Sequence, residues 1–381
     1  MRDAWALDDS IHFLNHGSYG ATPKAVLAKQ QELRAQLESE PVRFMSRELE
    51  PLLDAARARL ATFLGARTDD LVFVTNATTG INAVLRSLEF APGDELLTTS
   101  HGYNACTNVL RYVAERTGAK VIVAPVPFPV ESSGALAASV LDAVTPKTKL
   151  VLIDQITSPT ALIFPVDRLV KELEGRGIPV LVDAAHAPGH IPLSLDATGA
   201  SFTTGNLHKW VCAPKGVAFL HVRKDWQVRL RPSVISHGAN SSRTDRSRFH
   251  LEFDWVGTAD PTAMLCVPTA LDVMGSLFPG GWPELMRRNR DACLDVRGRM
   301  LGVLGTPTPC PPDVLPAMAS VIVPFEAEGL HDRLFDEFRL EIPVMRVGEL
   351  TLVRVSMQQH VRERDVEALL QAFRSLSSVR V

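Results

Sequence analysis

Cysteine is scarce in this sequence, and its placement excludes two common structural uses. The 381 residues include five cysteines, which stand far apart, and none belongs to a C-x-x-C pair. Neither a disulfide framework nor a zinc site is therefore predicted. Scattered reduced thiols are typical of the cytosol, so we expect a cytoplasmic protein. The segment MRDAWALDDSIHF carries acids where a signal peptide would have an apolar core, and no export signal is predicted.

The sequence also lacks an excess of charge and a long apolar run. Lys and Arg number 40 and Asp and Glu number 43, and without a basic cluster we expect no nucleic-acid partner. The longest apolar stretch, near 150–166, is interrupted by Asp154, Gln155 and Ser158, so no membrane span is predicted. The glycine-rich fingerprints of dinucleotide and nucleoside triphosphate sites are absent as well.

What is present is an alternation of short apolar runs with helical patterns. This order predicts an α/β fold with a mostly parallel seven-stranded sheet covered by helices on both faces. Such sheets bind ligands at the carboxyl ends of their strands. The predicted strands are 71–75, 95–99, 120–124, 150–154, 179–183, 201–204 and 217–222, and the predicted helices are 24–39, 49–64, 79–88, 104–117, 135–143 and 166–176.

The pattern changes after about residue 260. Here we expect a small C-terminal α+β domain over 261–381, beside a large domain over 15–260, with residues 1–14 packing near the small one. Its predicted elements are helices at 262–277, 284–304 and 363–376, strands at 319–324 and 351–356, and a proline-rich connector at 305–316.

Lys209 is the first candidate for chemistry. It lies in GNLHKW (205–210), shortly after a predicted strand. A desolvated lysine loses its proton more easily and becomes a nucleophile that forms imines. Taken alone, however, a solvated surface charge is the more frequent role of a lysine.

The segment VLVDAAHAPG (180–189) adds a carboxylate and a histidine. Asp183 ends a strand that we expect to be buried, where a carboxylate needs a partner. The protonated ring nitrogen of pyridoxal phosphate is such a partner, since it keeps the ring an effective electron sink. His186 is suited to a hydrogen bond with the ring hydroxyl. The alternatives are a helix N-cap for Asp183 and an ordinary loop position for His186.

A third segment, Asn76-Ala77-Thr78-Thr79-Gly80, follows a predicted strand and opens a helix. Backbone N–H groups and small hydroxyls at a helix N-terminus form a seat for phosphate. An ordinary threonine N-cap is an equally good interpretation of this segment alone.

Together these segments resemble the fold-type I, pyridoxal-phosphate-dependent class V aminotransferase family, and most closely its isopenicillin N epimerase-like and C–S lyase branch. The similarity runs in order through nearly the whole chain. The residues that carry it are LNHGSYG (14–20), TNATTGIN (75–82), HGYNACTN (101–108), IDQITSPTALIFPV (153–166), VDAAHAPG (182–189), GNLHKW (205–210), WVGTAD (255–260) and VRVS (353–356).

The resemblance implies pyridoxal 5'-phosphate as cofactor and a role for each matching residue. Lys209 would carry the cofactor and move a proton at the substrate Cα, and Asp183 would pair with the ring nitrogen. The other implied contacts are His186 and Ser158 to the ring hydroxyl, Thr78, Thr79, Asn206 and His208 to the phosphate, and Arg354 to the substrate α-carboxylate. Thr258 would reach the phosphate site of a neighbouring subunit, which implies a homodimer with shared active sites.

Four further residues have more than one possible role. Tyr103 takes the position of an aromatic ring that stacks on the cofactor, with His101 as the rival candidate. Asn15 and His16 match a segment that lines the substrate pocket. Core packing or a turn is an alternative for His101, Asn15 and His16. A run of arginines in 237–248 would bind a second carboxylate or form a solvated charge run.

The resemblance implies an enzyme that abstracts the Cα proton of a small amino-acid substrate. Desulfurases of this family need a mobile cysteine after an Arg-x-Gly element, but the comparable segment here, MRVGELT (345–351), has none. Epimerisation is the main hypothesis, with Lys209 on one face and Tyr103, His101 or His16 on the other. The alternatives are β-elimination from a cysteine S-conjugate or its sulfoxide, and transamination. A non-catalytic binding module is disfavoured because Lys209 and Asp183 are both present.

Overall fold

The computed structural model describes residues 1–378, and its largest element is a seven-stranded sheet. The strand order is β2-β8-β7-β6-β5-β3-β4, and every neighbouring pair is parallel except the two that involve β8. The mostly parallel seven-stranded sheet expected from the sequence is confirmed. In chain order the strands are β2 (Leu71–Val74), β3 (Glu95–Thr99), β4 (Lys120–Ala124), β5 (Thr148–Asp154), β6 (Val180–Asp183), β7 (Phe202–Asn206) and β8 (Ala218–Val222).

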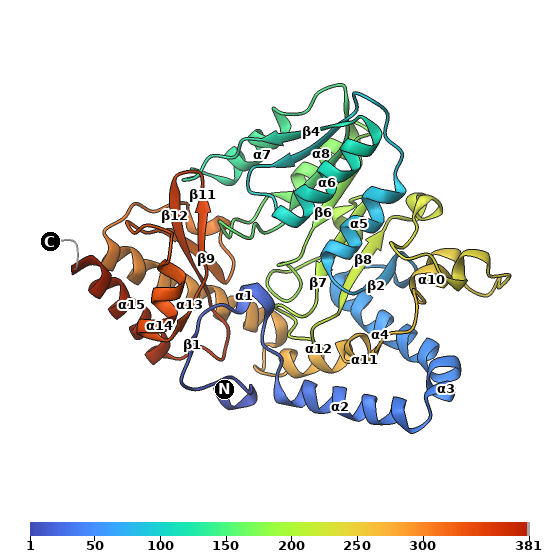
Figure 1. Cartoon of the computed structure of the whole chain (residues 1–381), viewed down its shortest axis with the longest axis horizontal. Helices are drawn as coiled ribbons and strands as arrows, with labels where there is room; N and C mark the ends of the chain where they lie inside the picture. The colour runs from blue at the N-terminus through green and yellow to red at the C-terminus, as the bar shows by residue number, and fades with distance from the viewer. Residues whose placement is uncertain (379–381) are drawn as a thin grey trace.

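Helices cover both faces of this sheet (Figure 1). Side chains along a strand point to opposite faces in turn, so Leu150 and Leu152 of β5 enter one core, whereas Val151 and Ile153 enter the other. The first core is closed by α5 (Ala77–Ser87), α6 (Asn104–Thr117) and α10 (Arg248–Phe253), and the second by α7 (Ser133–Leu141) and α8 (Val166–Gly175). The short helices α1 (His16–Tyr19), α3 (Pro41–Arg43) and α9 (Leu195–Thr198) lie in connections.

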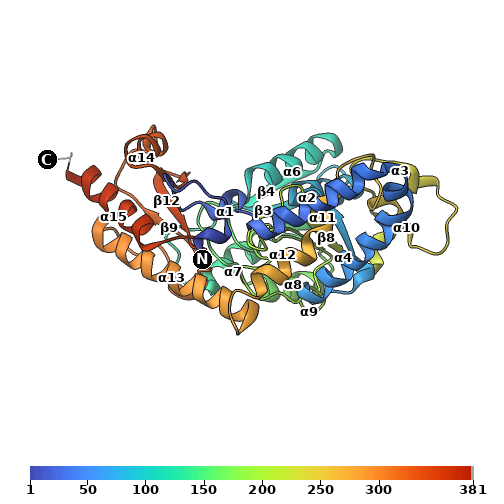
Figure 2. The same ribbon diagram turned by 90° about the horizontal axis from the view of Figure 1, so that it is seen from below.

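Beyond β2, a further layer contains α2 (Lys24–Ser39) and α4 (Leu49–Leu64), and two short helices pack against both (Figure 2). These are α11 (Thr262–Leu265) and α12 (Val267–Gly275), where the sequence predicted a single helix over 262–277. Pro268 lies in the first turn of α12. Because proline has no N–H and its ring blocks the preceding turn, it favours a new helix start there.

A second unit contains the C-terminal part of the chain. Its core is a three-stranded antiparallel sheet of order β11-β12-β9, and α13 and α15 pack on each other beside it. Its elements are α13 (Gly281–Leu304), β9 (Met318–Ile322), α14 (Leu330–Phe338), β10 (Leu340–Glu341), β11 (Val344–Val347), β12 (Leu350–Ser356) and α15 (Glu363–Ser378). The sequence did not predict α14, β10 or β11.

The N-terminal segment joins the two units. Its strand β1 (His12–Phe13) pairs in parallel with β10, and Asn15 bridges to Ser356 at the end of β12. Figure 1 shows this dark blue segment between the sheet and the orange and red unit. The predicted boundary near residue 260 falls before α11 and α12, and these helices pack on the large unit. None of the helices within 1–378 is both long and apolar enough to cross a bilayer.

Candidate active site

A cavity of about 350 Å³ opens at the carboxyl ends of the parallel strands. Its walls come from the segments that follow β2, β3, β5, β6 and β7, together with Ser18 and Tyr19 of the N-terminal segment. Among the residues predicted from the sequence, the lining includes Thr78, Tyr103, Ser158, Asp183, His186, Asn206, His208 and Lys209. Most of the predicted residues therefore lie together at the carboxyl ends of the strands, where sheets of this kind bind ligands.

Lys209 projects into this cavity from the turn after β7. Its Nζ lies 3.0 Å from Nε2 of His186, and its carbonyl oxygen lies 3.0 Å from Nε2 of His16. Burial, followed by the nearby charge of Arg354, lowers the pKa of Lys209 to about 7. A substantial fraction of the amine is therefore neutral at physiological pH and able to attack a carbonyl carbon.

The backbone around Lys209 is held by a close contact with Gly20. This glycine has φ +70°, and a Cβ built on it would lie 2.1 Å from the carbonyl oxygen of His208 and 2.9 Å from Cα of Lys209. Only glycine permits both the backbone conformation and the approach. The N-terminal segment therefore fixes the position of the reactive lysine.

Asp183 ends β6 inside the same cavity. Its Oδ1 accepts a hydrogen bond from the amide of Ala185 (2.9 Å), and its Oδ2 accepts one from Sγ of Cys106 (3.1 Å). Burial raises the pKa of this carboxyl above its ordinary value. No Lys, Arg or His among the described residues forms a salt bridge with it, so the site fits a cationic ring nitrogen that would supply the missing counter-charge.

His186 lines the same cavity and has a neutral imidazole ring. Burial, and next the charge of Lys209, hold its pKa well below the ordinary value. Its Nδ1 is buried and has no hydrogen-bond partner among residues 1–378. A neutral imidazole with an unused ring nitrogen fits a hydroxyl group of a bound ring.

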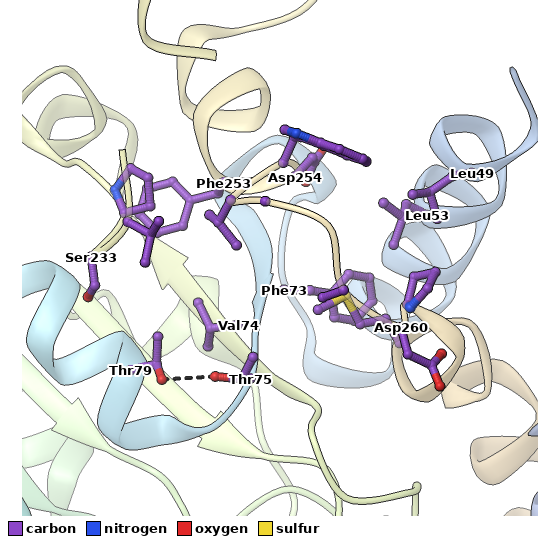
Figure 3. Close-up of a pocket in the computed structure, with 18 of the residues that line it drawn as sticks. Leu49, Leu53, Phe73, Val74, Thr75, Thr79, Ser233, Phe253, Asp254 and Asp260 are labelled. Carbon is purple, nitrogen blue, oxygen red and sulfur yellow. Dashed lines mark hydrogen bonds between the residues drawn. The ribbon is translucent and has the colours of Figure 1, made fainter. Parts of the chain in front are cut away.

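The N-terminus of α5 forms another part of the cavity wall. The side chain of Asn76 caps it by accepting from the amide of Thr79 (2.9 Å), and Oδ1 of Asn206 accepts from the amide of Ala77 (2.9 Å). Thr78 lines the cavity, whereas the hydroxyl of Thr79 is turned to Thr75 at 2.9 Å and borders a separate apolar cavity (Figure 3). The positive end of the helix dipole is thus directed at a site that fits a phosphate.

Arg354, on β12, lies beside the cavity and is only 1% exposed. One guanidinium nitrogen donates to the carbonyl oxygen of Ser158 (2.6 Å) and to its Oγ (3.2 Å), and the other donates to Oγ of Ser18 (3.1 Å). Burial lowers its pKa to about 10, so it stays charged. A buried cation without a carboxylate partner among the described residues fits an anionic ligand such as a carboxylate.

Tyr103 and His101, the two candidates for the side chain that stacks on the cofactor ring, have different surroundings. Tyr103 is 46% exposed and lines the cavity. His101 is buried, its Nδ1 lies 3.0 Å from Oγ1 of Thr160, and it borders an adjoining cavity of about 610 Å³ rather than the first one. Burial lowers the pKa of His101 to about 4, so its ring is neutral.

Asn15 and His16, expected to line the substrate pocket, lie behind its wall. Nδ2 of Asn15 donates to Glu341 (2.9 Å), and its Oδ1 accepts from Ser18. His16 is fully buried, with Nδ1 3.0 Å from Nε2 of His360, and burial lowers its pKa to about 3. Both residues hold other residues of the site in place, and neither is among the residues that line the cavity.

Other predicted residues lie outside the cavity of this chain. Thr258 is exposed on the loop after α10 and is not among the lining residues. In the arginine run, Arg243 is paired with Glu50 and Arg246 with Asp54. These ion pairs favour the interpretation as a charged surface.

Several lining residues were not predicted as site residues: Ser18, Tyr19, Asp154 and Lys215. Asp154 could have been found by the rule that identified Asp183, since it ends the neighbouring strand. Lys215, whose Nζ donates to the carbonyl oxygen of Gly20 (3.0 Å), follows the lysine segment. Ser18 and Tyr19 lie in the segment LNHGSYG (14–20), which marked this part of the chain, but the sequence pointed to Asn15 and His16 within it.

Comparison with known proteins adds to this geometry. The profile described as aminotransferase class V matches residues 12–255. The chain is 34% identical to isopenicillin N epimerase of Amycolatopsis lactamdurans over 394 residues, which cover 99% of this chain and 98% of that protein. It is 32% identical to putative L-cysteine desulfhydrase 2 of Oryza sativa subsp. japonica, with coverages of 88% and 74%. The structure of the cystine C–S lyase C-DES with cysteine persulfide has the same fold, with a TM-score of 0.82 at 20% identity and coverages of 96% and 98%.

Proposed function

Because this chain belongs to the aminotransferase class V family, we propose that it is a pyridoxal 5'-phosphate enzyme that removes the Cα proton of a small amino-acid substrate. When bound, the cofactor makes that proton acidic by acting as an electron sink. The observation that carries the proposal is the pair of Lys209 and Asp183 in one cavity. The first is a buried amine with a pKa of about 7, and the second is a buried carboxyl without an ion-pair partner in residues 1–378.

We assign residues to the cofactor as the family resemblance implies, and all of them except Thr79 line the cavity. The aldehyde carbon would be held by Lys209, the ring nitrogen by Asp183 and the ring face by Tyr103. The hydroxyl would be held by His186 and Ser158, and the phosphate by Thr78, Thr79, Asn206 and His208. Thr79 is the least direct of these, because it does not line this cavity and its hydroxyl is hydrogen-bonded to Thr75, which does.

Arg354 binds the α-carboxylate of the substrate in this proposal. Its guanidinium is preorganised by Ser158 and Ser18, both of which line the cavity. Carboxylate binding at Arg354 turns the Cα–H bond toward Lys209, whose neutral amine takes the proton.

Epimerisation is the reaction that we propose first, in keeping with the epimerases among the relatives. It needs a second group that returns the proton from the opposite face. Of the three candidates Tyr103, His101 and His16, Tyr103 lines the cavity. Burial raises its pKa above the ordinary value, so the phenol holds its proton and can donate it.

β-Elimination of a sulfur group is the alternative, in keeping with the L-cysteine desulfhydrases among the relatives. It requires only Lys209 as base and an acid that assists the leaving group. Transamination is the remaining possibility within the family.

Product analysis distinguishes these reactions. The holoenzyme is incubated in D2O with S-substituted L-cysteines and with non-eliminating L-amino acids, and pyruvate, ammonia and the configuration at Cα are measured. Epimerisation predicts a deuterated D-product without pyruvate, whereas rapid pyruvate release would identify a lyase. Formation of an oxo acid with retention of the amino group on the cofactor would identify an aminotransferase.

Attachment of the cofactor is tested separately. Borohydride reduction followed by peptide mass spectrometry should find the pyridoxyl adduct on Lys209, and Lys209→Ala should lose the yellow imine absorption. An adduct on another side chain, or none, would remove the basis of the proposal.

We further propose a homodimer in which Thr258 reaches the phosphate site of the neighbouring subunit. Next to the phosphate seat is an apolar cavity of about 100 Å³, lined by Phe73, Val256 and Met264 among others (Figure 3). Val234 and Val256 line this cavity and are exposed, as is Ile235, the chain neighbour of Val234. Contiguous exposed apolar surface is typical of a protein interface, and Thr75 borders both cavities, so a subunit docked there would adjoin the phosphate.

We also propose a cytoplasmic location. All five cysteines are buried and free, which is compatible with a reducing compartment. Fractionation of cells that produce the protein with its own N-terminus tests this proposal, and recovery in an exported fraction would contradict it.

A further inference from the structure

Two carboxyl groups lie together at the ends of β5 and β6, and the proposed function gives a role to only one of them, Asp183. Asp154 and Asp183 are register partners on these neighbouring parallel strands, and both line the cavity. They are 4% and 3% exposed. Two carboxylates this close in a low-dielectric site cannot both be charged without a large energetic penalty.

The hydrogen bonds of the two carboxyls are unequal. Both oxygens of Asp183 accept, one from the amide of Ala185 and one from the thiol of Cys106. Asp154 accepts at Oδ2 from the amide of Tyr103 (3.1 Å), while its Oδ1 is buried and has no partner among residues 1–378. Donors on both oxygens favour the anion at Asp183, whereas Asp154 has a single donor and a second oxygen that is free to carry a proton.

The surrounding charges also favour a protonated Asp154 and a charged Asp183. Burial and the charge of Asp183 raise the pKa of Asp154 well above its ordinary value. The hydrogen bond from the amide of Tyr103 and the charge of Lys209 lower this pKa, but by less. Lys209 acts on both carboxyls, but a substantial fraction of its amine is neutral at physiological pH. Cys106, the remaining titratable group of the cluster, holds its proton because burial raises its pKa.

The same contacts attach the first turn of α6 to the sheet. Tyr103 is the N-cap of α6 and Cys106 lies in its first turn; one donates to Asp154 and the other to Asp183. The backbone position of Tyr103, and with it the ring over the cavity, is therefore set by the strand-end carboxyls. Cap residues fix the position of the chain that enters a helix.

We propose that Asp154 is a positioning residue: as a neutral carboxylic acid it holds Tyr103 over the cavity through the backbone of α6 and leaves the single negative charge of the pair on Asp183. This inference rests on the proposed function for its catalytic consequence. The protonation state and the attachment of α6 are properties of the protein alone.

Infrared difference spectroscopy of the holoenzyme at neutral pH tests the protonation state. The spectrum of wild type minus Asp154→Asn should contain a C=O stretching band of a protonated carboxyl that shifts in D2O. The control is Asp336→Asn, which removes an exposed carboxyl of α14 and should change only carboxylate bands. Absence of the protonated band at Asp154 would overturn the proposal.

A double-mutant cycle tests the positioning role. Asp154→Ala should lower kcat/KM and the affinity for pyridoxal phosphate about tenfold or more, since it leaves the buried amide of Tyr103 unpaired, and Asp154→Asn should recover most of the loss. If Asp154 acts through Tyr103, then Asp154→Ala should add little to Tyr103→Ala. Full additivity, or no recovery by asparagine, would contradict the role.

A matched control separates this role from general core damage. Cys106→Ala removes the second attachment of α6, and Cys293→Ala removes a thiol that is equally buried but distant from the cavity. We expect Cys106→Ala, and not Cys293→Ala, to weaken cofactor binding. If the lysine adduct were absent, the proposed function would fail while the infrared result would still stand.

Discussion

Lys209 and Arg354 are two buried basic residues whose charges repel each other, and this repulsion favours the chemistry proposed for both. Arg354 is the second cause, after burial, of the lowered pKa of Lys209. Arginine keeps its charge at any physiological pH, whereas lysine gives up its proton. At the scale of single residues, this difference suits the arginine to the proposed role of permanent anion binder and the lysine to that of base and nucleophile.

The first prediction concerns the pH dependence of cofactor attachment. Since the pKa of Lys209 is lowered from 10.5 to about 7, the reactive neutral amine accumulates as the pH rises through about 7. The rate of imine formation between apo-protein and pyridoxal phosphate, followed by stopped-flow absorbance, should rise with a midpoint there. Arg354→Gln removes a neighbouring cation and should move the midpoint upward. A wild-type midpoint close to that of free lysine would contradict the prediction.

The second prediction concerns recognition of the substrate carboxylate. Arg354→Lys should raise KM for an α-amino acid about ten- to hundredfold, because an ammonium cannot reproduce the planar fork held by Ser158 and Ser18. The matched control is Arg346→Lys on the neighbouring strand β11, where the arginine is exposed. Binding of a primary amine without a carboxylate should be unaffected by Arg354→Lys; equal weakening of both ligands would argue against a carboxylate clamp.

At the scale of elements, the contact between α5 and β7 sets the position of the proposed phosphate seat. A Cβ built on Gly80 would lie 2.3 Å from Oγ1 of Thr204, whose hydroxyl donates to the carbonyl oxygen of Phe219 (2.7 Å). Glycine thus lets the first turns of the helix approach the strand closely. Asn206 at the end of β7 makes a second link through the amide of Ala77.

The third prediction follows from this contact. Gly80→Ala should lower the free energy of unfolding by about 1–3 kcal/mol through overpacking, and should weaken binding of pyridoxal phosphate more than that of pyridoxal. The control is Gly302→Ala in α13, where nothing lies within 4 Å, and where alanine should stabilise the helix by about 0.5–1 kcal/mol. Denaturant titration and cofactor fluorescence measure the two effects, and a neutral Gly80→Ala would refute the packing argument.

At the scale of the whole molecule, the cavity is built from parts that lie far apart in the sequence. The N-terminal segment supplies Ser18 and Tyr19, and the large unit supplies Lys209 and Asp183. Arg354 of the small unit lies beside the cavity and donates to Ser158 and Ser18 in its wall. A movement of the small unit relative to the large one would therefore carry the carboxylate site toward or away from the reactive lysine. The proposed second subunit would complete the opposite side, next to the N-terminus of α5.

The fourth prediction concerns this assembly. The wild-type protein should sediment as a dimer, and Ile235→Asp should shift it toward the monomer and reduce its affinity for pyridoxal phosphate, because a charge would be buried at the interface. Val123→Asp is the control, since Val123 is also exposed but lies on the edge strand β4 at the far end of the sheet. A monomeric wild-type protein with full cofactor affinity would contradict the dimer.

The sequence alone determined the order of the strands along the chain and the residues at their carboxyl ends. Lys209, Asp183 and Thr78 could be brought together from sequence because strands that run in the same direction end at one edge of a sheet. β6 and β7 are parallel neighbours, and β2 runs in the same direction on the other side of β8. Tertiary structure alone decided which side chains of the connecting segments face the cavity. His16 turns to His360 and Asn15 to Glu341, while Ser18 from the same segment lines the wall. Those directions depend on contacts with residues more than 300 positions away. The local sequence therefore cannot predict them.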